Sequence, residues 1–390
     1  MRVLVITQQF PNAAEPLASP FNRQMVAALA RRCPVQVLAP IPWYPGARQL
    51  SRWSQAGRLL QVPAREVIDG LEVHHPRFLH PPRMGRRWAG WLYARSLAGE
   101  VRRRRGSFDV LFSSWAYPDG HAAVLLARQS GVPAVVKVSG SDINVVGRLP
   151  GVEQNLRRTL PQAGRIVAVS RPLGEAVAAL GVARERIEVI TNGVDQALFH
   201  PRDRQEARAA LGHGGDTRSW CLYVGRLEPV KGVAELLEAF GRLARSRADV
   251  RLAIVGDGSL RQACARSAAS LGDRVLLAGS QPLEAVPRWM AASDLLVLPS
   301  RAEGTPNVAL EALACGRRVV ATRVGGTPDV ITGPELGELV APGDPEALAR
   351  ALSGALGQAY VPEEVARAGA RHGWDESARR LEAALQGALA

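Results

Sequence analysis

The sequence predicts an α/β protein of two domains, each built on a doubly wound, Rossmann-like parallel sheet. The chain has 390 residues, which is long for one hydrophobic core and suits two domains of ordinary size. In both halves, apolar segments of strand length alternate with helix-like segments, and this alternation is typical of parallel sheets covered by helices. The pair Asn192-Gly193 lies between the two series and permits a sharp change of backbone direction. We therefore place the domain boundary there.

The first half contains the first series of strands and helices. Strands are expected at residues 2–7, 35–39, 67–75, 109–114, 134–139, 165–170 and 187–190. Helices are expected at residues 22–32, 88–105, 120–130, 154–160 and 172–180. The loop after the first strand, residues 8–20, is rich in proline and alanine. It either shapes one side of a ligand site or is only a surface loop.

The second half repeats the alternation after a polar helix and loop at residues 202–215. Strands are expected at residues 220–225, 251–256, 274–279, 295–299 and 318–322, and a terminal helix at 376–389. Residues 295–322 are the clearest unit of this half, because a short helix at 306–315 separates its two apolar strands. Together these segments predict one βαβ unit of a parallel sheet.

That unit shows where a ligand would bind. Thr305 is the expected N-cap of the helix, and Pro306 suits the first position because proline has no N–H to leave unpaired. Gly316 is the expected helix stop. The loop at residues 300–305 therefore lies at the carboxyl end of a strand, where open α/β sheets bind ligands.

Two glutamates flank the start of this helix. Glu303 lies in the loop, and Glu311 follows eight positions later. Because a helix rises about 1.5 Å per residue, the two carboxylates can lie roughly 10 Å apart. This spacing suits a ligand with two hydroxyl-bearing parts, such as a nucleotide sugar, since carboxylates accept hydrogen bonds from sugar hydroxyls. The alternative is that both are surface glutamates beside a helix start.

A cationic loop follows the first strand of the second half. It begins with Gly225-Arg226 and ends with Lys231-Gly232. The first glycine allows a close turn, and the arginine and the lysine can both reach a diphosphate. Lysine is scarce in this chain, occurring only at positions 137 and 231, so its presence in this loop carries weight. The alternative is two surface cations beside a loop.

These motifs resemble those of the retaining glycosyltransferases of family 4. The segment from Glu303 to Glu311 is similar to the E-x7-E signature of that family. The loop from Gly225 to Gly232 resembles its G-R-x4-K-G segment. Residues 325–329, with the sequence GGTPD, resemble its G-G-x-P-E segment, with aspartate where glutamate is usual.

The resemblance implies the GT-B fold, in which two Rossmann-like doubly wound domains face a central cleft. The acceptor-side domain would comprise residues 1–193, and the nucleotide-sugar donor domain residues 194–372. A terminal helix at residues 373–390 would pack back on the first domain.

The resemblance also implies roles for single residues. Glu303 would face the donor sugar, and Glu311 would hold the ribose. Arg226 and Lys231 would face the diphosphate, where fixed cations lower the barrier by electrostatic preorganisation. Further donor-binding residues implied by the matching motifs are Gly225, Gly304, Thr305, Pro306, Asn307 and Val308.

The activity implied is transfer of a hexose from a nucleoside-diphosphate sugar, with retention of anomeric configuration. The acceptor would be a glycan or a lipid-linked molecule in cell-surface polysaccharide biosynthesis. Asp257 lies between glycines, and no second carboxylate forms an Asp-x-Asp site with it. We therefore expect no metal ion, and no cofactor other than the donor substrate.

The first half contributes candidates on the donor-sugar or acceptor side. Tyr117 begins the turn Tyr117-Pro118-Asp119-Gly120, which is similar to a strand-to-helix turn of the family. Ser139 and Asp142 lie in a segment that resembles the family's H-G-x-D motif, with serine in place of histidine. A serine hydroxyl can bond a sugar but carries no charge near neutral pH. Sugar positioning is expected from Ser139 or Asp142, with a turn or N-cap role as the alternative for Asp142.

Composition narrows the choice of partners. The formal net charge of +13 comes almost wholly from arginine. No zinc finger, RNP-type motif or recognition helix indicates nucleic acid, which leaves an anionic substrate or an anionic membrane surface. Residues 83–105 combine arginines with Trp88 and Trp91, as a helix lying on a membrane does. The alternative is a core-packing helix with a solvated basic edge.

Cellular location is predicted from what the sequence lacks. The cysteines are scattered without a Cys-x-x-Cys pair, which indicates buried thiols in a reducing compartment. No apolar run is long enough to span a bilayer, and the amino terminus does not have a signal-peptide pattern. We expect a cytoplasmic protein, with peripheral attachment to the inner face of the cytoplasmic membrane if residues 83–105 bind lipid.

Two other functions stay open. A nucleotide-sugar 2-epimerase of the same fold would release a free sugar nucleotide and need no acceptor, although the E-x7-E spacing argues against it. A non-catalytic sugar-nucleotide-binding subunit is suggested by Ser139 in place of histidine. The residues that argue against that subunit are Arg226, Lys231, Glu303 and Glu311.

Overall fold

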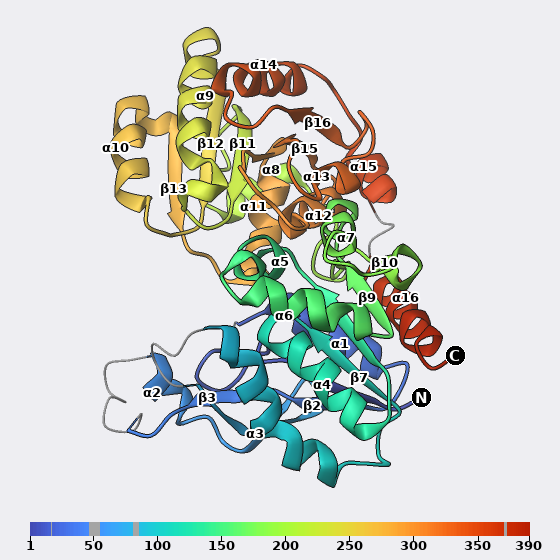
Figure 1. Cartoon of the computed structure of the whole chain (residues 1–390). Helices are drawn as coiled ribbons and strands as arrows, with labels where there is room; N and C mark the ends of the chain where they lie inside the picture. Colours follow the sequence, from blue (N-terminus) through green and yellow to red (C-terminus); the bar gives the residue numbers. More distant parts are fainter. Residues whose placement is uncertain (17, 47–54, 81–85, 370–372) are drawn as a thin grey trace. The chain divides into compact units, whose positions relative to one another are not determined.

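The computed structural model describes residues 1–16, 18–46, 55–80, 86–369 and 373–390. These residues divide into two compact units, one of Met1–Asn192 with Trp374–Ala390 and one of Gly193–Gly373 (Figure 1). Each unit contains a largely or wholly parallel sheet with helices on both faces. The α/β class and the two Rossmann-like domains predicted from the sequence are confirmed.

The main sheet of the first unit has the strand order β10-β9-β8-β7-β1-β2-β5-β4. Its strands are β1 (Val3–Ile6), β2 (Val35–Leu38), β4 (Arg65–Ile68), β5 (Leu71–His74), β7 (Val110–Ser114), β8 (Ala134–Val138), β9 (Arg165–Ala168) and β10 (Ile187–Val189). β4 and β5 are antiparallel, and the other pairs in this sheet are parallel. A separate parallel pair joins β3 (Ile41–Trp43) to β6 (Arg77–Leu79).

Helices cover both faces of this sheet. The helices of this unit are α1 (Pro20–Ala30), α2 (Gln55–Leu59), α3 (Ala89–Arg103), α4 (His121–Ser130), α5 (Ser141–Asn144), α6 (Val152–Thr159), α7 (Arg171–Ala178) and α16 (Trp374–Gly387), of which α2 contacts the separate strand β3. Short helical turns are η1 (Arg86–Trp88), η2 (Ala116–Gly120), η3 (Val146–Arg148), η4 (Leu160–Gln162) and η5 (Arg184–Arg186). Tyr93, Leu126 and Leu156 belong to the core on one face. Leu29 of α1 and Leu381 of α16 belong to the core on the other face.

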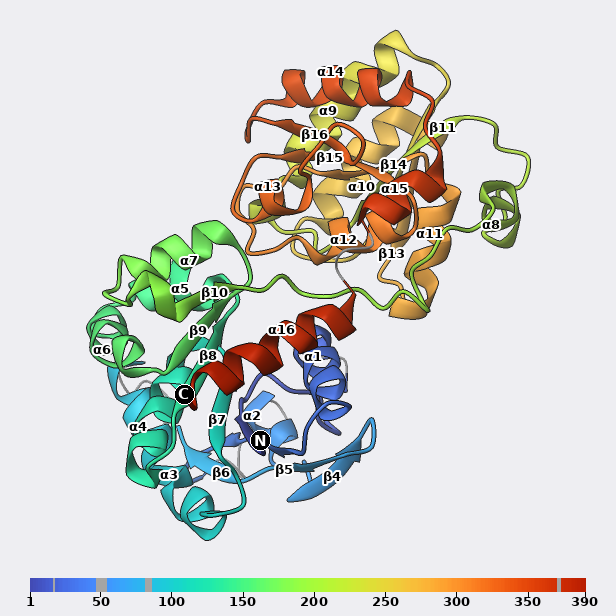
Figure 2. The same cartoon turned by 90° about the vertical axis from the view of Figure 1, so that its right-hand side faces the viewer.

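The chain returns to the first unit through α16. This helix lies along α1, although the two are far apart in sequence (Figure 2). Two ion pairs of 2.7 Å join their surfaces, Arg31 with Asp375 and Arg32 with Glu382. Buried apolar side chains of α16, among them Leu381, complete the core beside α1.

One predicted strand is wrong as a single element. Residues 67–75 lie in two antiparallel strands, β4 and β5, which a tight turn at Asp69 and Gly70 joins. Both turn residues have positive φ, 51° and 78°, as a two-residue hairpin turn requires. The Asp-Gly pair was therefore a turn signal inside an apolar run. The strands β3 and β6, each three residues long, lie outside the predicted segments.

The sheet of the second unit is parallel throughout, in the order β13-β12-β11-β14-β15-β16. Its strands are β11 (Ser219–Val224), β12 (Val250–Val255), β13 (Val275–Gly279), β14 (Leu295–Leu298), β15 (Arg318–Thr322) and β16 (Gly337–Val340). The predicted βαβ unit is confirmed, because β14 and β15 pair in parallel and α12 connects them. β16 was not predicted.

The helices of the second unit also form two layers (Figure 1). They are α8 (Arg204–Ala210), α9 (Val233–Ser246), α10 (Arg261–Leu271), α11 (Val286–Ala292), α12 (Asn307–Ala314), α13 (Thr327–Val330), α14 (Pro345–Leu356) and α15 (Pro362–Gly369), with the short turns η6 (Pro229–Lys231), η7 (Gly272–Arg274) and η8 (Leu283–Ala285). Trp220 and Leu313 belong to the core on one face. Phe240 and Leu352 belong to the core on the other.

Candidate functional site

The strand order of the second unit reverses direction between β11 and β14. From β11 the chain proceeds to β12 and β13 on one side, and then returns to β14, β15 and β16 on the other. The carboxyl ends of β11 and β14 are therefore a topological switch point, where open α/β sheets bind ligands. The loops that follow these two strands, residues 225–232 and 299–306, are the cationic loop and the first glutamate loop of the sequence analysis.

Glycines bring these loops into backbone contact. A Cβ on Gly232 would lie 1.9 Å from the carbonyl oxygen of Pro299, and a Cβ on Gly325 would lie 1.8 Å from that of Glu303. Both glycines have positive φ, 66° and 48°, a conformation that disfavours other residues. The cationic loop, the glutamate loop and the loop after β15 are thus fixed against one another without intervening side chains.

Lys231 and Glu303 form an ion pair across the switch point. Lys231 Nζ donates to Glu303 Oε1 at 2.7 Å, and the two side chains are 23% and 12% exposed. Ser300 Oγ donates to the same Oε1 at 2.6 Å. No described residue donates to Glu303 Oε2, so this oxygen is available to a ligand hydroxyl.

Hydrogen bonds from β15 and from the loop after it also fix the glutamate loop. Thr322 Oγ1 donates to the carbonyl oxygen of Ser300, and the N–H of Gly326 donates to the carbonyl oxygen of Gly304 at 2.8 Å. Thr322 is buried. The position of Glu303 therefore depends on two neighbouring strands as well as on its own loop.

Arg226 extends from the other side of the switch point. Its backbone is fixed, because its carbonyl oxygen accepts hydrogen bonds from Tyr223 Oη at 2.8 Å and from the N–H of Glu228 at 3.0 Å. The side chain is exposed, and its guanidinium forms no ion pair or hydrogen bond with a described residue. A rigid backbone thus supports a guanidinium that is free to bind an anion.

Helix α12 begins at Asn307, with Pro306 as its N-cap residue. The prediction of Thr305 as N-cap is therefore wrong by one position, and Thr305 is instead buried within the loop. The predicted helix stop is confirmed: α12 ends at Ala314, and Gly316 has a φ of 72° and donates to the carbonyl oxygen of Leu313. The first N–H groups of a helix have no partner inside the helix, so the amide of Val308 can donate to a group outside α12.

Glu311 lies one turn into α12 and is buried. Only 8% of the residue is exposed. Burial penalises the charged carboxylate and raises the pKa of Glu311 to about 7. This glutamate is therefore not a solvated surface residue, and its carboxyl can either donate or accept a hydrogen bond near neutral pH.

The candidates of the first unit lie near its own switch point, between β1 and β7. Tyr117 is buried, and its hydroxyl donates to the carbonyl oxygen of Arg86 at 2.6 Å and accepts from the N–H of Gly90 at 3.0 Å. These contacts connect the turn after β7 to the start of α3. Both hydrogen-bonding directions of the phenol are thus occupied inside the protein.

Asp142 is fully buried and accepts hydrogen bonds from backbone N–H groups. The donors are Ala116 at 2.9 Å, Ser139 at 3.0 Å and Gly140 at 2.7 Å. These contacts support the turn role that the sequence analysis gave as the alternative for Asp142. The side chain of Ser139 is partly exposed and forms no hydrogen bond with a described residue.

Each half of the chain matches a family model of known glycosyltransferases. The family model described as Glycosyltransferase Family 4 matches residues 18–198, and the model described as Glycosyl transferases group 1 matches residues 218–358. A D-inositol 3-phosphate glycosyltransferase of Catenulispora acidiphila is 31% identical over 367 residues, which cover 87% of each chain. This chain belongs to glycosyltransferase family 4. A glycosyltransferase of Bacillus subtilis named for teichuronic acid biosynthesis is 28% identical over 359 residues, covering 90% of this chain and 88% of that one.

Solved structures show the fold of this family 4 glycosyltransferase. HepE of Anabaena, solved in complex with UDP, has a TM-score of 0.73 with it at 20% identity, covering 99% of this chain and 100% of HepE. Sucrose-phosphate synthase of Thermosynechococcus elongatus has a TM-score of 0.68 at 21% identity, covering 100% and 97%. The glycosyltransferase has the GT-B fold.

Most of the candidate residues of the glycosyltransferase lie on the loops that the sequence predicts, but the sequence analysis missed two supporting residues. Ser300 and Thr322, which hold Glu303, had no predicted role. The sequence does indicate both, because each lies at the carboxyl end of a predicted strand, where parallel sheets bind ligands. The predicted donor residues Gly225, Gly304, Thr305, Pro306 and Asn307 lie in or beside the loops of the second unit described above.

The basic segment of the first unit has a side that packs into the core, as the core-packing alternative predicted, and an exposed side that carries tryptophan and arginine. Leu92, Leu97 and Val101 of α3 pack into the core, whereas Trp88 and Trp91 are 49% and 52% exposed. The exposed side chains of Trp91, Arg95 and Arg102 follow a helical spacing and form one stripe with Trp88. Residues 83–85 of the predicted segment lie outside the described residues. The stripe is therefore both aromatic and basic.

Among the residues that the structure describes, no helix of the glycosyltransferase combines the length and apolar character needed to cross a bilayer. Within the same residues, no group of three or more His, Cys, Asp or Glu side chains is arranged to hold a metal ion. The described cysteines, at positions 33, 221, 264 and 315, are buried free thiols.

Proposed function

We propose that this glycosyltransferase moves a hexose from a nucleoside-diphosphate sugar to a glycan or lipid-linked acceptor, with retention of anomeric configuration. The observation that carries the proposal is the 2.7 Å ion pair between Lys231 and Glu303. In this pair a cation that can bind phosphate and a carboxylate that can accept from sugar hydroxyls lie together at the switch point of the second sheet. Retention is proposed because the segment from Glu303 to Glu311 resembles the signature of the retaining members.

Two cations would bind the donor diphosphate. The guanidinium of Arg226 is exposed and has no partner among the described residues, so it can offer its planar fork to phosphate oxygens. The ammonium of Lys231 has three N–H donors and uses one on Glu303. As the diphosphate departs, both cations would stabilise its growing charge. Because fixed cations supply this stabilisation, we propose a metal-independent transfer.

Two carboxyl groups would bind the sugar parts of the donor. Glu303 Oε1 accepts from Lys231 and Ser300, which leaves Oε2 to accept from hydroxyls of the transferred sugar. Glu311 would bind the ribose hydroxyls at the other end of the donor. The helix start at Asn307 and Val308 would add backbone N–H donors near the diphosphate.

The acceptor proposal rests on chemistry outside the donor loops. The exposed stripe of Trp88, Trp91, Arg95 and Arg102 suits an anionic lipid surface, because tryptophan enters the interfacial layer and arginine binds lipid phosphates. A relative is named for teichuronic acid biosynthesis. We propose a peripheral enzyme at the cytoplasmic face of the membrane that acts in cell-surface polysaccharide biosynthesis.

Donor identity is the first test. Thermal stability would be measured with UDP-, GDP- and ADP-sugars, beginning with UDP-glucose because HepE has been solved with UDP and with UDP-glucose. We expect stabilisation by one nucleotide class that is lost in Lys231→Ala and Glu311→Ala. Arg288→Ala is the control, because Arg288 is exposed on α11. Stabilisation that survives in both site variants would contradict the proposed site.

Product analysis then separates transfer from the other functions. With donor and acceptor present, proton NMR of the glycoside should show the anomeric configuration of the donor sugar. An inverted product would contradict retention. Release of a free epimerised sugar nucleotide without acceptor would indicate a 2-epimerase instead. Donor binding without turnover on any acceptor would indicate a non-catalytic binding subunit.

A further inference from the structure

A cavity of about 750 Å³ lies within the second unit, away from the donor loops. It is lined at the amino ends of three parallel strands, by Ser219 of β11, by Asp294 before β14 and by Arg317 before β15. The donor loops follow the carboxyl ends of the same strands. Since a strand rises about 3.3 Å per residue, the amino and carboxyl ends of the six-residue strand β11 are roughly 20 Å apart. The cavity is therefore separate from the proposed donor site.

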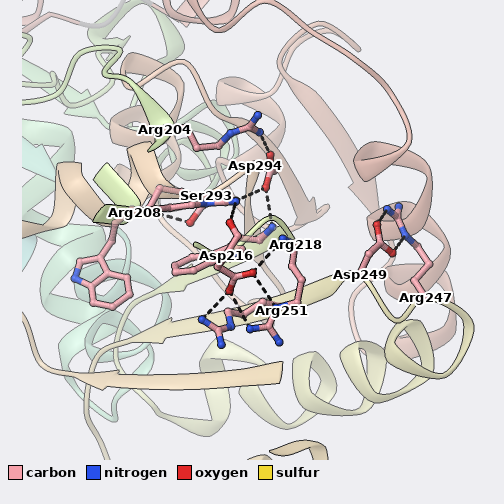
Figure 3. Close-up of polar contacts among 12 residues, drawn as sticks. Arg204, Arg208, Asp216, Arg218, Arg247, Asp249, Arg251, Ser293 and Asp294 are labelled. Atoms are coloured by element: carbon pink, nitrogen blue, oxygen red, sulfur yellow. Dashed lines mark hydrogen bonds and ion pairs between the residues drawn. The ribbon is translucent and has the colours of Figure 1, made fainter. Parts of the chain in front are cut away.

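Two acidic groups that line this cavity, Asp294 and Asp203, already have partners. Arg204 and Arg208 both bind the carboxylate of Asp294 (Figure 3). Asp294 Oδ2 also accepts from the backbone N–H of Trp220 at 2.7 Å. Asp203 accepts from the N–H of Glu206 at 2.8 Å as the N-cap of α8. Asp294 and Asp203 therefore carry hydrogen bonds of their own, and Asp294 is shared by two cations.

The remaining arginines of the lining, Arg202 and Arg317, form no ion pair with a carboxylate of the described residues. Arg317 is only 4% exposed, forms no ion pair with a described residue, and its Nε has no hydrogen-bond partner. One of its terminal nitrogens donates to the carbonyl oxygen of Arg202 at 3.4 Å. Arg202 in turn donates to the carbonyl oxygen of Leu198 at 3.1 Å and forms no ion pair among the described residues. Glu363, the other lining carboxylate, is exposed at the rim.

A buried guanidinium without a counter-charge is costly, and proteins normally pair such charges. A bound anion would supply the missing charge and accept from the unpaired Nε of Arg317. Guanidinium groups bind phosphate oxygens through two parallel hydrogen bonds. A volume of about 750 Å³ is typical of small-molecule sites. Tyr360 also lines the cavity, where its side chain interacts with Arg317 and the guanidinium of Arg318 lies 5.9 Å from its ring centroid.

We propose that this cavity is a second ligand site, which binds a small phosphate-bearing molecule through Arg317 and Arg202. The site belongs wholly to the second unit and does not require the donor to be bound. The strands β11, β14 and β15 begin at this cavity and end at the donor loops, so both sites can be occupied at once.

Binding of inorganic pyrophosphate tests the proposal. Isothermal calorimetry at fixed ionic strength would use the full chain carrying Arg226→Gln and Lys231→Gln, which removes the cations of the donor site. We expect saturable binding that persists in this background and weakens at least tenfold when Arg202→Gln is added. Arg317→Gln in the same background should abolish it. The matched control is Arg288→Gln, which removes one exposed positive charge outside the cavity.

Two results would overturn the proposal. Pyrophosphate binding that disappears with the donor-site substitutions alone would place the anion at the donor loops. Binding that Arg202→Gln and Arg288→Gln weaken equally would be a general effect of charge. Because Arg317 is buried and its variant can fail to fold, Arg202→Gln decides the outcome in that event, since Arg202 is exposed.

Discussion

Ser300 positions Glu303 through a single hydrogen bond of 2.6 Å. In Ser300→Ala the carboxylate keeps Lys231 but loses this donor, and a hydrogen bond to a charged group contributes about 1.5–3 kcal/mol. We expect kcat to fall about tenfold or more, with little change in thermal stability, because Glu303 becomes free to rotate. Steady-state kinetics would measure this effect. The control is Ser280→Ala, an exposed serine after β13.

An unchanged kcat in Ser300→Ala would contradict the positioning role of the serine. A loss of stability without a kinetic effect would indicate that Ser300 serves the loop rather than the carboxylate. Ser300→Thr keeps the hydroxyl and should restore part of the activity, which a purely structural role does not predict.

Glu311 gives the stability of the protein a pH dependence with a definite sign. Burial raises its pKa from 4.5 to about 7 in the folded state. Between these values the folded protein keeps a proton that the unfolded chain has released, so this group makes stability fall as pH rises from 4.5 to 7. The loss is about 3 kcal/mol in total, since one pKa unit corresponds to about 1.4 kcal/mol.

The Glu311→Gln variant removes this titration while keeping the shape of the side chain. We expect its denaturant midpoint to gain on that of the wild type as pH rises through this range. Asp119, whose pKa burial raises to about 7, contributes in the same direction to both proteins and cancels in the difference. Parallel stability curves would mean that Glu311 is ionised throughout.

At the scale of single elements, α3 is the helix that we propose binds the membrane surface. Its buried side fixes it to the first unit, and its exposed stripe includes Trp88, Trp91 and Arg95. We expect the protein to sediment with vesicles that contain anionic lipid, and added salt to weaken this binding because it screens the arginines. Replacing both tryptophans by alanine should reduce the bound fraction several-fold.

Trp43→Ala provides the matched control, because Trp43 is 40% exposed on β3 and outside the stripe. Equal sedimentation of wild type and the double tryptophan variant would exclude the stripe as the binding surface. So would sedimentation that is independent of anionic lipid.

Strands that are continuous apolar runs could be predicted from the sequence. Strands interrupted by a turn, or with a polar composition, could not. The strands β11, β12, β14 and β15 are apolar runs ended by turn residues, and each was placed within one or two positions. The sequence predicts one strand where the structure has the hairpin of β4 and β5, because both strands are apolar in part and only the Asp69-Gly70 pair marks the turn. β16 contains a glycine and a glutamate, so its composition does not indicate a strand.

For the donor loops as well, the sequence predicts the positions of residues but not their contacts. That Lys231 and Glu303 lie at one edge follows from the rule that parallel strands end on the same side. Their direct contact does not follow, because it requires Gly232 and Gly325 to let backbones approach closely. Likewise, the sequence places Tyr117 and Asp142 beside a switch point, but only the structure shows that their polar atoms are occupied inside the protein.

At the scale of the whole molecule, the first unit depends on a helix encoded at the far end of the chain. α16 places Leu381 and Leu385, both fully buried, against the core that contains α1. Replacing a fully buried leucine by alanine costs about 2–5 kcal/mol. We therefore expect Leu381→Ala to destabilise the first unit although the substitution lies after the second unit in sequence.

Hydrogen exchange detected by mass spectrometry would locate this effect. Peptides from β1, β2 and α1 should lose protection in Leu381→Ala, whereas peptides from β11 and β12 should exchange as in the wild type. Gln386→Ala, an exposed position on the same helix, should leave both sets unchanged. Equal loss of protection in both units would show that they unfold together, and then the division of the chain into two compact units would not extend to its stability.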